Sequence, residues 1–151
     1  MENSEIDYIR SVWQLVLADK LHHGVELFVR LFDRYPETKS KFARLSSSCP
    51  DPETMRRSAR LRAHAGRVVT SLSSIIEIID DMEMVDENVY LLGESHNRRK
   101  VTNADFQKFT DVLLSYLSDT LPEDVYPPAA ADAFTKMMGV FNKKMSQHLD
   151  E

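Results

Sequence analysis

The sequence predicts an all-α fold, and three observations support this prediction. Apolar side chains recur every three to four residues through six long stretches, which is the period of a helix with one buried face. Runs that alternate apolar and polar residues, as half-buried strands do, are absent. Only 4 of the 151 residues are glycine, so few positions favour a break. We therefore expect six to eight helices in one domain that spans residues 1–151.

The first two helices are expected before Pro36. Ser4 is a suitable N-cap for a helix that runs to Asp19. Its apolar face consists of Ile6, Ile9, Trp13, Val16 and Leu17. Pro36 should end the second helix, because proline cannot continue a helix and disfavours helical backbone in the residue before it. The apolar face of that helix consists of Val25, Phe28, Leu31, Phe32 and Tyr35, and a short turn through Phe42 follows.

Residues 46–50, Ser-Ser-Ser-Cys-Pro, form the clearest predicted loop. Asp51 followed by Pro52 predicts the start of the next helical region, because aspartate caps helices and proline fits their first turn. A long apolar stripe then continues to about Asp80. The stripe consists of Leu61, His64, Ala65, Val68, Leu72, Ile75, Ile76 and Ile79.

Three further helices are expected in the second half of the chain. The first has its apolar face at Val85, Val89, Leu92 and His96. Thr102 with Asp105 three residues later approximates a capping box for the next helix. The apolar face of that helix consists of Phe106, Phe109, Leu113, Tyr116, Leu117 and Leu121. The last helix should begin near Pro127 and Pro128, with an apolar face of Ala133, Phe134, Met137, Met138, Phe141 and Met145.

Two histidines, His64 and His96, lie within these apolar stripes, so both imidazoles should project inward. A buried imidazole must satisfy both ring nitrogens, which makes histidine costly on an apolar face unless the nitrogens find partners. The pair therefore indicates a metal or haem held between two helices. The alternative is that both are structural histidines bonded to backbone carbonyls. The remaining histidines, His22, His23 and His148, are expected to face solvent.

Composition limits the other possibilities. The net charge is −5 and basic residues alternate with acidic ones, so nucleic acid is an unexpected partner. No apolar run is long enough for a transmembrane helix, and neither end of the sequence carries a leader or lipidation signal. The single cysteine, Cys49, allows no intrachain disulfide. We expect a cytoplasmic protein without a membrane anchor.

Three segments in order carry a family resemblance. Residues 27–38 with Phe42, residues 61–68 with His64 and Val68, and residues 91–96 followed by Val101 and Phe106 are similar to segments of the globins. Within this family the chain resembles the neuroglobins most and the cytoglobins second, in length, in the spacing from Phe42 to His64 to His96, and in its aromatic Phe28. Neuroglobins often have a second cysteine near the position of Cys49, which this chain lacks.

The resemblance implies a globin fold whose helices enclose haem b. It implies that His96 is the permanent iron ligand and that the Leu92 carbonyl accepts a hydrogen bond from its second ring nitrogen. His64 would lie on the opposite face and either bind the iron or donate a hydrogen bond to a bound gas. The other residues implied at the haem are Phe28, Phe42, Val68, Leu92, Val101, Phe106 and Met138 around the macrocycle, and Arg44 and Arg67 at its propionates.

The resemblance implies reversible binding of O₂, NO and CO, with both histidines on the iron when no gas is present. An alternative is NO dioxygenation or nitrite reduction, for which an external reductase must supply electrons. A third reading is a haem-free interaction module in which both histidines are structural. A monomer or weak dimer is expected.

Overall fold

The computed structural model describes residues 1–42 and 51–149, and within these ranges it contains helices and no strands. The helices are α1 (Asn3–Ala18), α2 (Lys20–Arg34), the 3-10 helix η1 (Pro36–Phe42), α4 (Pro52–Arg57), α5 (Ala59–Glu77), α6 (Met82–Arg98), α7 (Asn103–Thr120) and α8 (Pro128–Met145). The predicted all-α class and the predicted range of six to eight helices are therefore confirmed over the described part of the chain.

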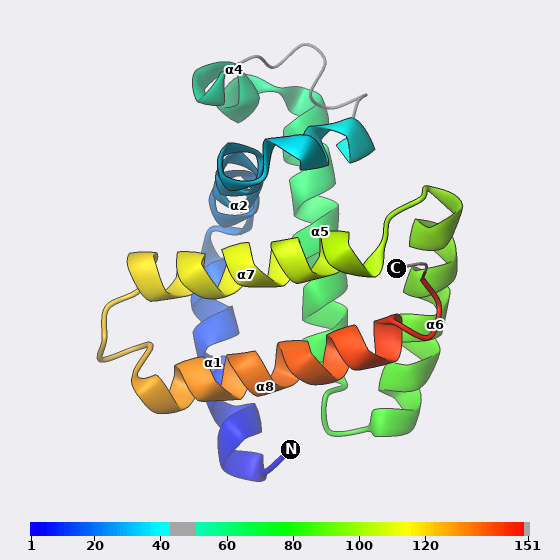
Figure 1. The fold of residues 1–151 in the computed structure, drawn as a ribbon. Coiled ribbons are helices and arrows are strands. Elements are labelled where there is room, and N and C mark those ends of the chain that lie inside the picture. Colours follow the sequence, from blue (N-terminus) through cyan, green and yellow to red (C-terminus); the bar gives the residue numbers. More distant parts are fainter. Residues whose placement is uncertain (43–50, 150–151) are drawn as a thin grey trace.

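The helices pack in crossing pairs. Figure 1 shows α7 and α8 side by side across one face, with α5 running behind them and α6 standing beside their ends. Helix α2 packs against α4, α5 and α7, while α8 packs against α1, α6 and α7. Helices α5 and α6 follow each other in sequence, yet they are not among the pairs with close backbone packing. No helix among the described residues is both long and apolar enough to cross a bilayer.

One part of the core lies where α1 packs against α5 and α8. Trp13 on α1 is 2% exposed and its ring lies 6.4 Å from that of Phe134 on α8, which is fully buried. The indole N–H of Trp13 donates to the hydroxyl of Ser73 on α5 at 2.7 Å. Because a buried indole N–H needs a partner, this bond fixes how α1 lies against α5.

Local sequence signals place most of the helix ends correctly. The Asp51 side chain accepts a hydrogen bond from the Thr54 N–H, at 2.8 Å. Thr102 and Asp105 form the predicted capping box at the start of α7. Helix α8 begins at Pro128, and α2 ends at Arg34, two residues before Pro36.

Two predicted boundaries are wrong. Helix α1 is capped by Glu2 and not by Ser4, because the carboxylate of Glu5 accepts a hydrogen bond from the Glu2 N–H at 2.9 Å and completes a capping box there.

The region after Asp51 is two helices and not one. Ser58 interrupts it with extended backbone and caps α5, its hydroxyl accepting a hydrogen bond from the Leu61 N–H at 3.2 Å. Leu17, predicted on the apolar face of α1, is 36% exposed.

Gly24 permits the close crossing of α2 and α5. A methyl group at this position would lie 3.0 Å from the carbonyl oxygen of Ala65 and 3.1 Å from a methyl group of Val69. The carbonyl oxygen belongs to the backbone of α5 and cannot move without shifting the helix. Gly139 on α8 offers a comparison, because nothing lies within 4 Å of a methyl group there.

We predict opposite effects of alanine at these two glycines. Gly24→Ala should lower the free energy of unfolding by about 1–3 kcal/mol through overpacking, whereas Gly139→Ala should raise it by up to about 1 kcal/mol through helix propensity. Urea denaturation of both variants measures the difference. Equal stabilisation by the two substitutions would show that α2 and α5 are not in tight contact at Gly24.

Candidate functional site

The fold brings His64 and His96 toward one interior region from different helices. His64 lies in the second turn of α5 and His96 lies in the last turn of α6. Both side chains are partly buried. The two rings are near enough that a charge on His96 would lower the pKa of His64. The pair therefore comes from two helices whose backbones are not closely packed against each other.

Aromatic rings surround the His64 imidazole. The ring of Phe28 on α2 lies 5.2 Å from it, and the ring of Phe42 at the end of η1 lies 5.3 Å from it, both edge to face. Phe28 and Phe42 also contact each other at 5.4 Å. Within the described ranges the contacts of the His64 ring are aromatic and include no hydrogen bond. The imidazole is therefore held by shape, and its nitrogens are available to a ligand.

His96 is oriented by its own helix. Its Nδ1 lies 2.7 Å from the carbonyl oxygen of Leu92, one turn earlier in α6. Because a carbonyl can only accept, Nδ1 carries the proton and Nε2 carries the lone pair. The ring of Phe106 on α7 contacts the imidazole edge to face at 5.3 Å. This arrangement leaves Nε2 as the atom that can bind a metal.

Burial keeps both imidazoles neutral. It lowers the pKa of His64 from 6.5 to about 4, with smaller contributions from the positive charges of Arg67, His96 and Arg99. Burial also lowers the pKa of His96, although the hydrogen bond to Leu92 opposes it. Neutral imidazole is the form that binds metals, so the site is prepared for a metal-bearing ligand at neutral pH.

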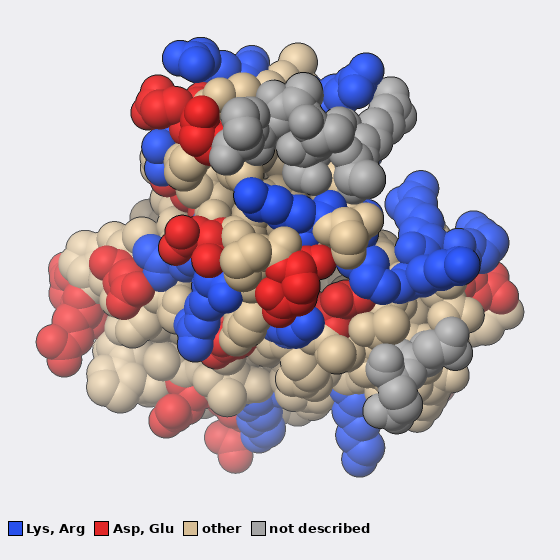
Figure 2. Space-filling view, turned by 45° about the horizontal axis from the view of Figure 1, so that its top comes forward, with Lys and Arg blue, Asp and Glu red and all other residues tan. Residues whose placement is uncertain are grey.

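The rim of this region is basic. Arg98, Arg99 and Lys100 begin two residues after His96 and are exposed. Figure 2 shows lysine and arginine side chains gathered over the connection between α6 and α7. Arg67 is exposed on α5, one turn beyond His64. Positive charge at an otherwise apolar region favours a ligand with an apolar body and an anionic edge.

The remaining predicted site residues lie at various depths. Val68, Leu92 and Val101 are partly buried, and Met138 is 1% exposed within the core. Arg44 falls outside the described residues, as does Cys49. The structure therefore gives no position for the predicted contact of Arg44.

A second layer of aromatic residues lies behind the site, and the sequence did not indicate that these rings support it. Phe32 contacts Phe42 at 5.7 Å, Phe109 contacts Phe28 at 6.2 Å, and Phe141 contacts Phe106 at 6.0 Å. All three belong to the predicted apolar stripes. The helical period of apolar residues does not distinguish a ring that supports the site from any other core residue. Arg99 was also missed, although the basic run after His96 signals it.

The prediction that the three other histidines face solvent is wrong for two of them. Nδ1 of His23 lies 2.7 Å from the hydroxyl of Tyr116, and burial lowers the pKa of His23. The ring of His148 is partly buried and packs edge to face on Tyr90 at 5.2 Å. His22 is exposed as expected. The errors arise because α7 and α6 cover these positions, which no local pattern reveals.

Comparison with known proteins identifies relatives over most of the chain. The Globin family model matches residues 25–145. Cytoglobin-1 of Danio rerio is 26% identical over 148 residues, which cover 97% of this chain and 84% of that protein. Cytoglobin-2 of Oryzias latipes is 32% identical over 124 residues, 82% of this chain and 69% of that protein. Cytoglobin-2 of Danio rerio is 30% identical over 131 residues, 86% of this chain and 72% of that protein.

These matches include the helices that carry both histidines and agree with the all-helical fold. They confirm the family resemblance found in the sequence. The order predicted within the family, neuroglobins before cytoglobins, stays a prediction. From the family model, the relatives and the fold together, the chain belongs to the globin family.

Proposed function

We propose that this globin binds haem b between α5 and α6 and reversibly binds O₂, NO and CO, with His64 competing for the position that the gas takes. One observation carries the proposal. Two partly buried, neutral imidazoles lie near each other on separate helices, and the tautomer of His96 leaves its Nε2 free. Two imidazoles are the number of axial ligands that a haem iron accepts from a protein.

The residues of this region fit such a cofactor. Phe28, Phe42 and Phe106 offer apolar surfaces on both histidine sides, suited to a flat macrocycle. Arg67 and Arg99 supply positive charge at the rim, suited to propionates. Helices α5 and α6 are not closely packed, so a bulky group between them displaces no helix contact of the core.

His96 is the stronger candidate for the permanent ligand. The Leu92 carbonyl fixes the ring's rotation and makes Nε2 more basic, as hydrogen-bond acceptors at the other ring nitrogen do for metal-binding histidines. Phe106 limits tilting of the ring from one side. His96 is thus oriented before any cofactor binds.

His64 is the conditional ligand. It has no comparable hydrogen bond within the described residues, and its ring is held by contacts with Phe28 and Phe42. An imidazole without such a hydrogen bond can change its position more easily than His96 can. His64 Nε2 would compete with an external gas for the haem iron. A preference of about 1.4 kcal/mol for the histidine would weaken gas binding roughly tenfold.

The aromatic residues exclude water from the site. Phe28 is 2% exposed, and Phe32 behind Phe42 is also 2% exposed. A dry pocket favours reversible gas binding over oxidation of the iron.

Replacing His64 tests the competition directly. His64→Leu removes the competing nitrogen and keeps an apolar side chain, so CO should bind the reduced, haem-loaded variant faster than it binds the original protein. Stopped-flow mixing with CO measures the rate. His22→Leu is the matched control, because His22 is exposed and lies outside the site. An unchanged rate in His64→Leu would contradict the role given to His64.

The pKa of His64 leads to a prediction for the haem-free protein. Its pKa is about 4 when folded and 6.5 ordinarily, so the unfolded chain binds more protons between these values. The free energy of unfolding should therefore fall as pH is lowered through this window, and less steeply in His64→Gln. Urea denaturation at a series of pH values measures both slopes, and NMR titration of the imidazole gives the pKa. A His64 that titrates near its ordinary value would show that it is not buried.

A further inference from the structure

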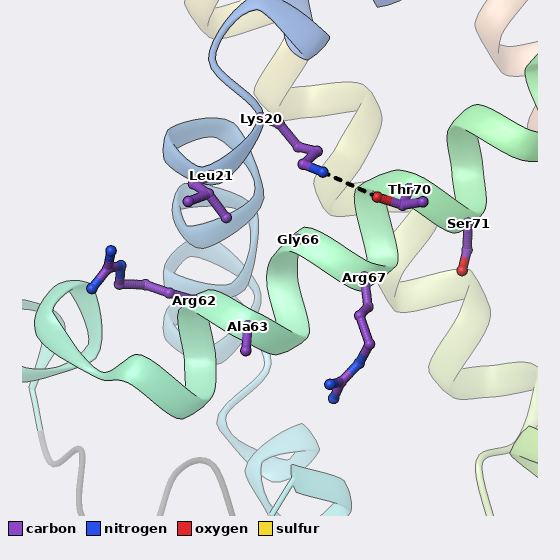
Figure 3. Close-up of a pocket in the computed structure, with 8 residues that line it drawn as sticks. All are labelled: Lys20, Leu21, Arg62, Ala63, Gly66, Arg67, Thr70 and Ser71. Atoms are coloured by element: carbon purple, nitrogen blue, oxygen red, sulfur yellow. Dashed lines mark hydrogen bonds between the residues drawn. The ribbon is translucent and has the colours of Figure 1, made fainter.

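A second concave region lies on the outer side of α5, away from the space between the two histidines. It is a groove of about 530 Å³ between the beginning of α2 and one face of α5. Three basic side chains line it, namely Lys20, Arg62 and Arg67, together with the hydroxyls of Thr70 and Ser71. Figure 3 shows Lys20 reaching toward Thr70, while the side chains of Arg62 and Arg67 extend from α5 in two other directions. Leu21 and Ala63 add apolar surface.

The basic side chains of this groove form no ion pair with the described carboxylates. Five other arginines, Arg10, Arg30, Arg34, Arg56 and Arg57, form ion pairs. Arg62 and Arg67 form none with any carboxylate of the described ranges. Acidic residues of α5 are limited to Glu77, its last residue. The basic face of the groove therefore lacks an internal counter-ion among the described side chains.

The placement of Arg62 is also unfavourable for the helix. Arg62 stands in the first turn of α5. The N-terminal end of a helix carries partial positive charge, so cations there raise the energy of the folded state. A bound anion would remove this repulsion and would gain from the same helix end.

One end of the groove is already organised for an anion. The Lys20 ammonium donates to the Thr70 hydroxyl at 3.2 Å, which holds the charge over the groove. The Thr70 hydroxyl can in turn donate to a ligand oxygen. Arg62 is eight residues before Thr70 in the helix, a separation of roughly 12 Å along the axis. A single phosphate cannot reach both ends, whereas a chain of phosphates can.

We propose that this groove binds a small anion with two or more linked phosphate groups, through Lys20 and Thr70 at one end and Arg62 at the other. Arg67 borders the groove and also lies near the rim of the haem site, so the residues that distinguish this proposal are Lys20 and Arg62. Haem binding and the proposed role of His64 are not required for it. The net charge of −5 repels anions from the surface as a whole, so binding must come from a local basic site.

The test is titration calorimetry of the haem-loaded protein with inorganic tripolyphosphate, at constant ionic strength. Lys20→Gln combined with Arg62→Gln should weaken binding about tenfold or more, because each lost contact is a charge-assisted hydrogen bond. Arg57→Gln combined with Arg60→Gln is the matched control, since it removes the same charge from exposed residues outside the groove. This control should change binding about twofold or less, because salt screens distant exposed charges.

Inorganic phosphate and vesicles distinguish the source of the phosphates. Inorganic phosphate should bind much more weakly than tripolyphosphate. Phosphatidylcholine vesicles that contain phosphatidylinositol bisphosphate test whether a lipid headgroup is the source. If these vesicles retain the protein although tripolyphosphate does not bind, and if this retention also depends on Lys20 and Arg62, the groove binds a lipid headgroup.

Three results would overturn the proposal. The first is that neither tripolyphosphate nor the vesicles with phosphatidylinositol bisphosphate bind the protein. The second is equal weakening in the groove variant and the matched control, which would indicate an effect of net charge alone. The third is equal binding of phosphate and tripolyphosphate, which would exclude a site with two ends. Circular dichroism and haem absorbance verify that each variant is folded.

Discussion

The structure depends most on the burial of two neutral imidazoles that face one space from different helices. Imidazole is polar, and its transfer from water costs free energy unless both nitrogens gain partners. Within the described residues, the one hydrogen bond found to either ring is that from Nδ1 of His96 to the Leu92 carbonyl. In the proposed haem complex the iron would bind the remaining nitrogens, and the cost of burying them would be offset.

The two helices that carry the histidines pack against different partners. His64 is held by α5, which crosses α2 closely because Gly24 has no side chain to separate them. His96 is held by α6, which packs on α8 and not closely on α5. The two histidine helices are thus anchored to different partners, and the space between them is not closed by direct packing. Phe28 and Phe106 then line that space from α2 and α7.

Features governed by neighbouring residues could be predicted from the sequence, and those governed by distant ones could not. The caps at Asp51 and Thr102 depend on side chains three residues away, so the sequence predicts them. The break at Ser58 is also local, but the apolar stripe continues through it and conceals it. His23 was misplaced because its partner, Tyr116, is 93 residues away. At the site, helical period indicated that His64 and His96 point inward, whereas the burial that lowers their pKa values requires the packed fold.

The paired absorption spectra of the freshly purified protein, first ferric and then reduced without added gas, test the central claim most directly. We expect low-spin, six-coordinate haem in both states, because both neutral imidazoles would bind the iron. A five-coordinate, high-spin ferrous spectrum would contradict the role of His64 as a ligand. A protein that neither contains haem nor takes it up would contradict the account of the site as a whole.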